Sequence, residues 1–107
     1  MKLADWVKHV ESRPGVYALG EFLASDPATA RPWTKGSRSG VIKSANVLIL
    51  MGTNPQRFEV ALDDKENVAT WKPGVAKGQR VAMELSLQIH PGGGQRIKGH
   101  GMVVIDP

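Results

Sequence analysis

The sequence contains no cysteine, which excludes disulfides, thiolate metal sites and a cysteine nucleophile, and permits a reducing compartment. Long apolar runs are missing too: short runs such as "VLILM" (47–51) fall far below the roughly 20 residues that span a bilayer. The segment "MKLADWVKHVES" (1–12) carries charges throughout and lacks the apolar centre of a secretory signal. We therefore expect a cytoplasmic protein with no membrane partner.

Acidic residues are absent between Asp26 and Glu59. This gap contains "RPWTKGSRSG" (31–40), in which Trp33 is surrounded by cations. These cations, with one just beyond the segment, are Arg31, Lys35, Arg38 and Lys43. Over the whole chain, 14 Lys and Arg against 10 Asp and Glu give a net charge of +4. Such a charge suits a polyanionic partner, although proteins without one also carry it.

The length of 107 residues predicts one domain with its own core. Apolar residues at spacings of three and four within residues 2–12 predict a short amphipathic helix that ends before Pro14. These apolar positions are Leu3, Trp6, Val7 and Val10. We expect residues 1–14 to form a helical leader and residues 16–106 to form the rest of the domain.

The remainder of the chain predicts five strands. The clearest lies in "QRVAMELSLQI" (79–89), where apolar residues occupy alternate positions, so that one face is core and the other is solvated. The expected strands lie near 16–24, 41–51, 57–63, 79–90 and 95–106. Turn signals separate them, and the one long gap follows the third strand. This layout is typical of an all-β, five-stranded OB-fold Greek-key barrel, although an SH3-like barrel would read similarly.

Two segments resemble bacterial single-stranded DNA-binding proteins. In that family a first strand with Gly and Leu is followed by Asp-Pro, an Arg and a Gly-containing hairpin, which "LGEFLASDPATARPWTKGSRSG" (19–40) matches. The matching positions are Gly20, Leu23, Asp26, Pro27, Arg31 and Gly36. The second segment, "KGQRVAMELSL" (77–87), is similar to the Lys-Gly-x-x-Val start of the fourth barrel strand. Together the two segments cover about a third of the chain.

The resemblance implies an OB-fold protein that coats single-stranded DNA without sequence preference, in replication or recombination. Two departures stand out, namely the helical leader and an end at "VVIDP" (103–107) without the acidic tail through which cellular members recruit partners. In its size and its lack of this tail, the chain is similar to small phage or mobile-element relatives, which would act in the host cytoplasm. Because linked sites strengthen binding to one strand, we expect a homodimer or a higher homo-oligomer.

Single-strand binding requires aromatic faces for base stacking and cations along the phosphates. Trp33 is the first candidate, because its segment is too rich in Gly, Ser, Thr and Pro to be core; the alternative is that it folds back over the barrel end. Tyr17 and Phe58 lie on expected strands, and Trp71 lies in "ATWKPG" (69–74), where a core or plug role is the alternative.

The candidate phosphate contacts are Arg31, Lys35, Arg38, Lys43, Lys72, Lys77 and Arg80. Arg96 and Lys98 of the last hairpin complete a second, scattered set. The alternative is a solvated loop whose charges keep an exposed hairpin soluble. If about five cations contact phosphates, the logarithm of affinity falls with the logarithm of salt at a slope of about −3 to −4.

Catalysis finds little support in the sequence, and we expect no enzyme, no metal and no cofactor. The three histidines, His9, His90 and His100, are not spaced as a local metal motif. "KGSRSG" (35–40) and "GGGQRIKG" (92–99) lack the order of a phosphate-binding loop. Two alternatives to DNA binding stay open, namely RNA binding and a β-barrel module that docks on an acidic protein surface.

Overall fold

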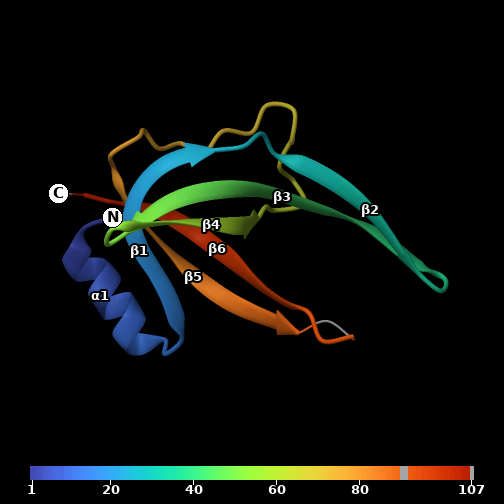
Figure 1. Cartoon of the computed structure of the whole chain (residues 1–107), viewed down its shortest axis with the longest axis horizontal. Coiled ribbons are helices and arrows are strands. Elements are labelled where there is room, and N and C mark those ends of the chain that lie inside the picture. Colours follow the sequence, from blue (N-terminus) through green and yellow to red (C-terminus); the bar gives the residue numbers. More distant parts are fainter. Residues whose placement is uncertain (90–91, 107) are drawn as a thin grey trace.

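The computed structural model describes residues 1–89 and 92–106, with the side chains of residues 88, 95 and 96 left aside. One helix is followed by six strands (Figure 1). Their bounds are α1 Leu3–Ser12, β1 Val16–Ser25, β2 Thr29–Lys35, β3 Arg38–Met51, β4 Asn54–Ala61, β5 Arg80–Ile89 and β6 Gln95–Ile105. The expectation of a β-rich chain with a short N-terminal helix is confirmed, whereas the strand count of five is wrong.

Five of the strands close into a ring in the order β1-β5-β6-β4-β3-β1. All of these pairings are antiparallel except the one between β4 and β6, which is parallel and involves Glu59 with Lys98 and Val60 with Gly99. β1 belongs to two pairings: residues from Val16 to Glu21 pair with β5, and residues from Glu21 to Ser25 pair with β3. The ring is therefore closed by one strand that changes partner midway.

Gly20 lies where β1 passes from one partner to the other. A Cβ at this position would lie 2.5 Å from the Leu50 carbonyl oxygen and 2.6 Å from Ile49 Cγ2. Any side chain would therefore hold β1 and β3 apart, which explains a glycine inside a strand. The register between these strands shifts between Phe22 and Ala24, and such a bulge bends a strand at a barrel corner.

The core fills the inside of the ring. Its eight clustered residues come from all the ring strands except β6, which adds Ile105 at 2% exposure. The cluster consists of Ala18, Phe22, Val47, Ile49, Phe58, Val60, Val81 and Met83. The alternating apolar residues expected to face the core in β5 are buried only in the first half of the strand. In the second half, Leu87 and Ile89 are 58% and 73% exposed. β5 runs past the start of β1, whose first residue pairs with Leu85, so among the described residues the second half of β5 pairs with β6 alone.

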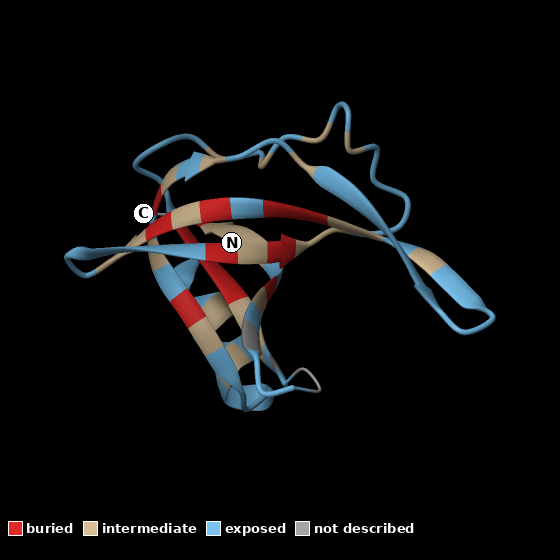
Figure 2. Ribbon diagram, turned by 45° about the vertical axis from the view of Figure 1, so that its right-hand side comes forward, coloured by how far each residue is buried: buried red, intermediate tan, exposed pale blue. Residues whose placement is uncertain are grey.

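The missed strand, β2, pairs only with the first part of β3, and every residue of β2 is exposed. Residues 29–44 therefore form a two-stranded ribbon that leaves the ring on one side (Figures 1 and 2). Gly36 has a φ of 63° in its two-residue loop, a conformation that glycine adopts readily in hairpins. Pro32 is tolerated because this strand is an edge. Without a buried face, β2 has no apolar alternation that would predict it.

α1 is tied to the ring by the two residues that precede it rather than by a buried face. The Met1 ammonium donates to the Val104 carbonyl at 2.8 Å, and Lys2 forms a parallel bridge with Asp106. No residue of α1 is buried. The helix is also too short and too polar to span a membrane, and the described residues contain no other helix.

Candidate nucleic-acid interface

The ribbon places the central cations and Trp33 on one face. Residues paired across two strands project to the same side of a sheet. In this register Arg31 lies opposite Ile42, Trp33 opposite Gly40, and Lys35 opposite Arg38. We call this side the outer face, because in β3 it continues into Asn46, between the buried Ala45 and Val47 that face the core.

Trp33 is held by the glycine across the ribbon. A Cβ at Gly40 would lie 2.8 Å from Trp33 Nε1 and 2.9 Å from both Cε2 and Cζ2. These three consecutive atoms form one edge of the indole, so this part of the ring packs against the Gly40 backbone. Aromatic rings cover glycines in this way across strands. The side chain stays 38% exposed, so the expected alternative, that Trp33 folds over the barrel end, does not describe it.

The cations on the outer face differ in what holds them. Arg31 lies 3.4 Å from Glu59 Oε1, a carboxylate whose side chain is 15% exposed. Lys35 and Arg38 are exposed at the ribbon tip, and neither has an acidic partner within 4 Å among the described residues. An unpaired cation can bind a phosphate without first breaking an ion pair. The ribbon tip therefore carries two cations without an acidic partner among the described residues. The end of the ribbon nearer the ring carries a third, Arg31, which Glu59 holds in place.

Lys43 lies on the other side of the ribbon. Its ammonium donates to the carbonyl oxygens of Asp64 and Glu66, at 2.6 and 2.8 Å. These bonds fasten the connection between β4 and β5 to β3. The structure thus gives Lys43 a structural role, away from the outer face on which we expected it with Arg31.

The two aromatic residues expected on strands, Phe58 and Tyr17, also lie away from the ribbon. Phe58 is 8% exposed and belongs to the core cluster, so its ring is not available to a base, and the expected contact is corrected to packing. Tyr17 is half-buried on β1, where its hydroxyl donates to the Arg13 carbonyl and its ring meets Trp6 edge-on. Tyr17 therefore lies beside α1 rather than on the ribbon.

The remaining expected contacts lie in the connection between β4 and β5 or at its end. Trp71 is half-buried there, and its amide donates to the Asn67 carbonyl at 2.9 Å. Lys72 and Lys77 are exposed. Arg80 begins β5 and pairs with Glu21 and Ile105 on the ring. The pairing of the ribbon includes none of these residues, so they do not share its outer face.

Of the last hairpin, Lys98 is half-buried on β6 opposite Glu59, while the side chain of Arg96 and all of His90 and Pro91 lie outside the described residues. Within the described part of the chain, no group of three or more His, Asp or Glu side chains could hold a metal ion. The acidic residue Asp63, just after β4, instead forms a turn: its carboxylate accepts a hydrogen bond from the Lys65 amide at 2.9 Å, as in an Asx turn.

Sequence reasoning missed two features of this surface. Gly40 was not singled out, although a two-residue loop at 36–37 places position 33 opposite position 40. Trp6, predicted only as an apolar position of the expected helix, is half-exposed and lines a pocket with His9 and His100. No signal in the sequence joins α1 to β6.

Comparisons with protein-family models, with curated proteins and with solved structures found no match for this chain.

Proposed function

We propose that this protein binds single-stranded DNA without sequence preference, with the outer face of the ribbon as its primary contact. The observation that carries the proposal is Trp33, packed against Gly40 and still 38% exposed, with three cations on the same face. Gly40 packs against part of the indole, and the exposed remainder of the ring is available to a base. Stacking of this kind is worth about 1–3 kcal/mol per base and accepts any base.

We also propose that the ring is an OB-fold barrel. Five ring strands, a parallel closure between β4 and β6, and a long connection between β4 and β5 support this assignment. OB folds bind oligonucleotides on the face of strands two and three and on the loops that flank it. Counted in chain order, β3 and β4 are the second and third strands of the ring, and the ribbon extends the connection between its first two strands.

The electrostatics support a phosphate backbone as the partner. Arg31, Lys35 and Arg38 share the outer face, and the carboxylate beside them, Glu59, lies within an ion pair. As in the family that the sequence resembles, coating of single strands would serve replication or recombination. A homodimer or higher homo-oligomer remains part of the proposal, and sedimentation velocity with and without oligo-dT tests it.

The experiment is intrinsic Trp fluorescence during titration with an oligo-dT of about 30 nucleotides, beside its duplex and the matching oligo-U, at two salt concentrations. We expect strong quenching by oligo-dT, little by the duplex, and an affinity that falls with salt. Equal binding of oligo-U would make RNA an equal ligand. No response to any nucleic acid would refute the proposal and direct attention to an acidic protein partner.

Two variants locate the contact. Trp33→Ala should weaken binding while the ring stays folded, because Trp33 lies outside the core cluster. Val41→Ala is the matched control, since Val41 is a 49% exposed apolar residue on the opposite face of the same ribbon. A loss of binding in both variants, or in neither, would contradict the assignment to the outer face.

A further inference from the structure

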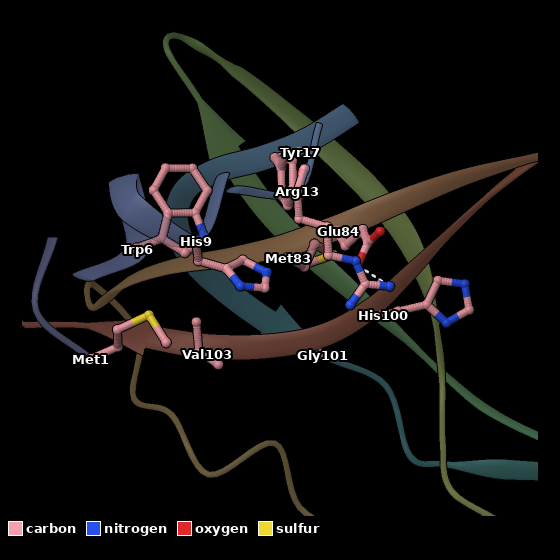
Figure 3. Close-up of a pocket in the computed structure, with 10 residues that line it drawn as sticks. All are labelled: Met1, Trp6, His9, Arg13, Tyr17, Met83, Glu84, His100, Gly101 and Val103. Atoms are coloured by element: carbon pink, nitrogen blue, oxygen red, sulfur yellow. Dashed lines mark hydrogen bonds and ion pairs between the residues drawn. The ribbon is translucent and has the colours of Figure 1, made fainter. Parts of the chain in front are cut away.

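A pocket lies between α1 and the outside of the ring, on the surface that the ribbon does not cover (Figure 3). Its volume is about 270 Å³. The helix supplies Trp6 and His9, β1 supplies Tyr17, and β5 and β6 supply Glu84 and His100. We call it the α1 pocket; its other lining residues are Met1, Arg13, Met83, Gly101 and Val103.

Three rings form an aromatic wall of this pocket. The Trp6 and Tyr17 ring centroids are 5.9 Å apart with the planes at 89°, and those of His9 and Tyr17 are 6.2 Å apart at 82°. The bond from the Tyr17 hydroxyl to the Arg13 carbonyl fixes the central ring. No residue of α1 is buried, so the rings of Trp6 and His9 do not pack into the core. Edge-on pairs of half-exposed rings offer open faces to a further planar group.

Charged and polar groups stand beside this wall. Arg13 lies 3.9 Å from Glu84, and the Arg13 side chain is 67% exposed. His100 and Ser86 share a hydrogen bond of 2.9 Å between Nε2 and Oγ. A guanidinium next to aromatic faces is the combination that a nucleotide uses, because the base stacks and the phosphate takes the fork of N–H donors.

The register joins the α1 pocket to the outer face of the ribbon. Arg31 contacts Glu59, which lies opposite Lys98 on β6. Lys98 in turn lies opposite Ser86 on β5, and Ser86 bonds to His100 of the pocket. Because paired residues project to one side, all five lie on the outside of the ring. One continuous surface therefore leads from the ribbon to the pocket.

We propose that a single strand bound at the ribbon continues across β4, β6 and β5 and places a base in the α1 pocket. This inference rests on the proposed function and extends it to a second stacking site. Five strand-to-strand steps separate β2 from β1 along this surface, which at about 4.8 Å each is about 24 Å before curvature. A strand within the range of about 4–16 nucleotides per barrel can cover such a path.

The test follows Trp6 alone. Replacing the other two tryptophans, as Trp33→Phe and Trp71→Phe, leaves Trp6 as the sole indole and keeps an aromatic ring at the ribbon. Labelled oligo-dT of about 4 and about 16 nucleotides is titrated, with anisotropy reporting binding and fluorescence reporting Trp6. We expect both oligonucleotides to bind, and only the longer one to quench Trp6 strongly.

Affinity supplies the second readout. Trp6→Leu and Arg13→Gln should each lower affinity for the longer oligonucleotide by about fivefold or more while leaving the shorter one unchanged. Val7→Ala, on the same helix and 41% exposed, is the control and should change neither. Because Arg13 lies beyond the end of α1, its variant tests the pocket even if the helix loosens in Trp6→Leu.

The outcomes separate the two proposals. If oligo-dT of either length fails to bind, the proposed function is wrong and this inference falls with it. If both lengths bind but Trp6 is not quenched, and Trp6→Leu and Arg13→Gln bind the longer strand as the unmodified chain does, only the inference is overturned. Equal quenching of Trp6 by the short oligonucleotide would also overturn it, because the pocket would then be the first site rather than the end of the path.

Discussion

The packing of Trp33 on Gly40 makes a sharp prediction for Gly40→Ala. The new Cβ would lie 2.8–2.9 Å from three indole atoms, against about 3.5–4.0 Å for ordinary carbon contacts. The indole would therefore have to move away by about 0.7 Å or more, or turn out of its position. Gly40 is not among the glycines with positive φ, so alanine suits the backbone and the effect acts through Trp33.

The expected loss follows from the stacking energy. A base stack is worth about 1–3 kcal/mol, which corresponds to about 5- to 150-fold in Kd. Gly40→Ala should lower the affinity for oligo-dT by about threefold or more and by no more than Trp33→Ala does. Its free energy of unfolding should stay the same or rise slightly, because alanine reduces the freedom of the unfolded chain. Weaker binding by an equally stable protein is the signature of a displaced platform.

The assay is a fluorescence anisotropy titration with labelled oligo-dT, together with thermal unfolding by circular dichroism. In a double-mutant cycle, Gly40→Ala should cost nothing further once Trp33→Ala is present. Val41→Ala again serves as the control on the opposite face of the ribbon. Wild-type affinity in Gly40→Ala, with Trp33→Ala impaired, would show that the glycine does not position the indole and would refute the reasoning.

Three further predictions concern charge and the ring. Lys35→Gln and Arg38→Gln should each reduce the magnitude of the log-log salt slope by about 0.7, whereas Lys65→Gln, an exposed cation outside the ribbon, should leave it unchanged. Gly20→Ala should lower the free energy of unfolding by about 1–3 kcal/mol, because its Cβ would lie 2.5 Å from a carbonyl oxygen of β3; an unchanged melting temperature would contradict this. Phe58→Ala should destabilise the fold by about 3–5 kcal/mol in chemical unfolding, and weaker DNA binding by an equally stable variant would restore Phe58 to the interface.

Much of the ring could be predicted because a strand with one buried face has apolar residues at alternate positions. The alternating apolar residues of β5 and the apolar stretch of β3 located these strands to within one to three residues. β2 escaped for the converse reason, since a strand exposed on both faces needs no alternation. The same rule explains the error at Leu87 and Ile89, whose alternation continues although the ring does not cover them.

The candidate site was predicted in part. The sequence singled out Trp33 and the cations around it, because a tryptophan among Gly, Ser, Thr and Pro has no core to join. It also grouped Lys43 with Arg31, although the ribbon turns them to opposite sides and Lys43 binds two carbonyls of the following connection. Whether residues of two neighbouring strands lie on the same side of a sheet depends on the register of their pairing. This register is set by the fold and cannot be read from either strand alone.

Local properties of the chain were thus determined by the sequence alone: the lack of cysteine, the net positive charge, the amphipathic helix, the buried strands and the exposed basic segment around Trp33. The tertiary structure decided what these parts share. It closed the ring through β1, packed Trp33 against Gly40, placed Phe58 in the core, and made Trp6 of α1 and His100 of β6 line one pocket. The physical reason is that periodicity records only whether a residue is buried, whereas contacts between distant residues depend on strand register and ring closure.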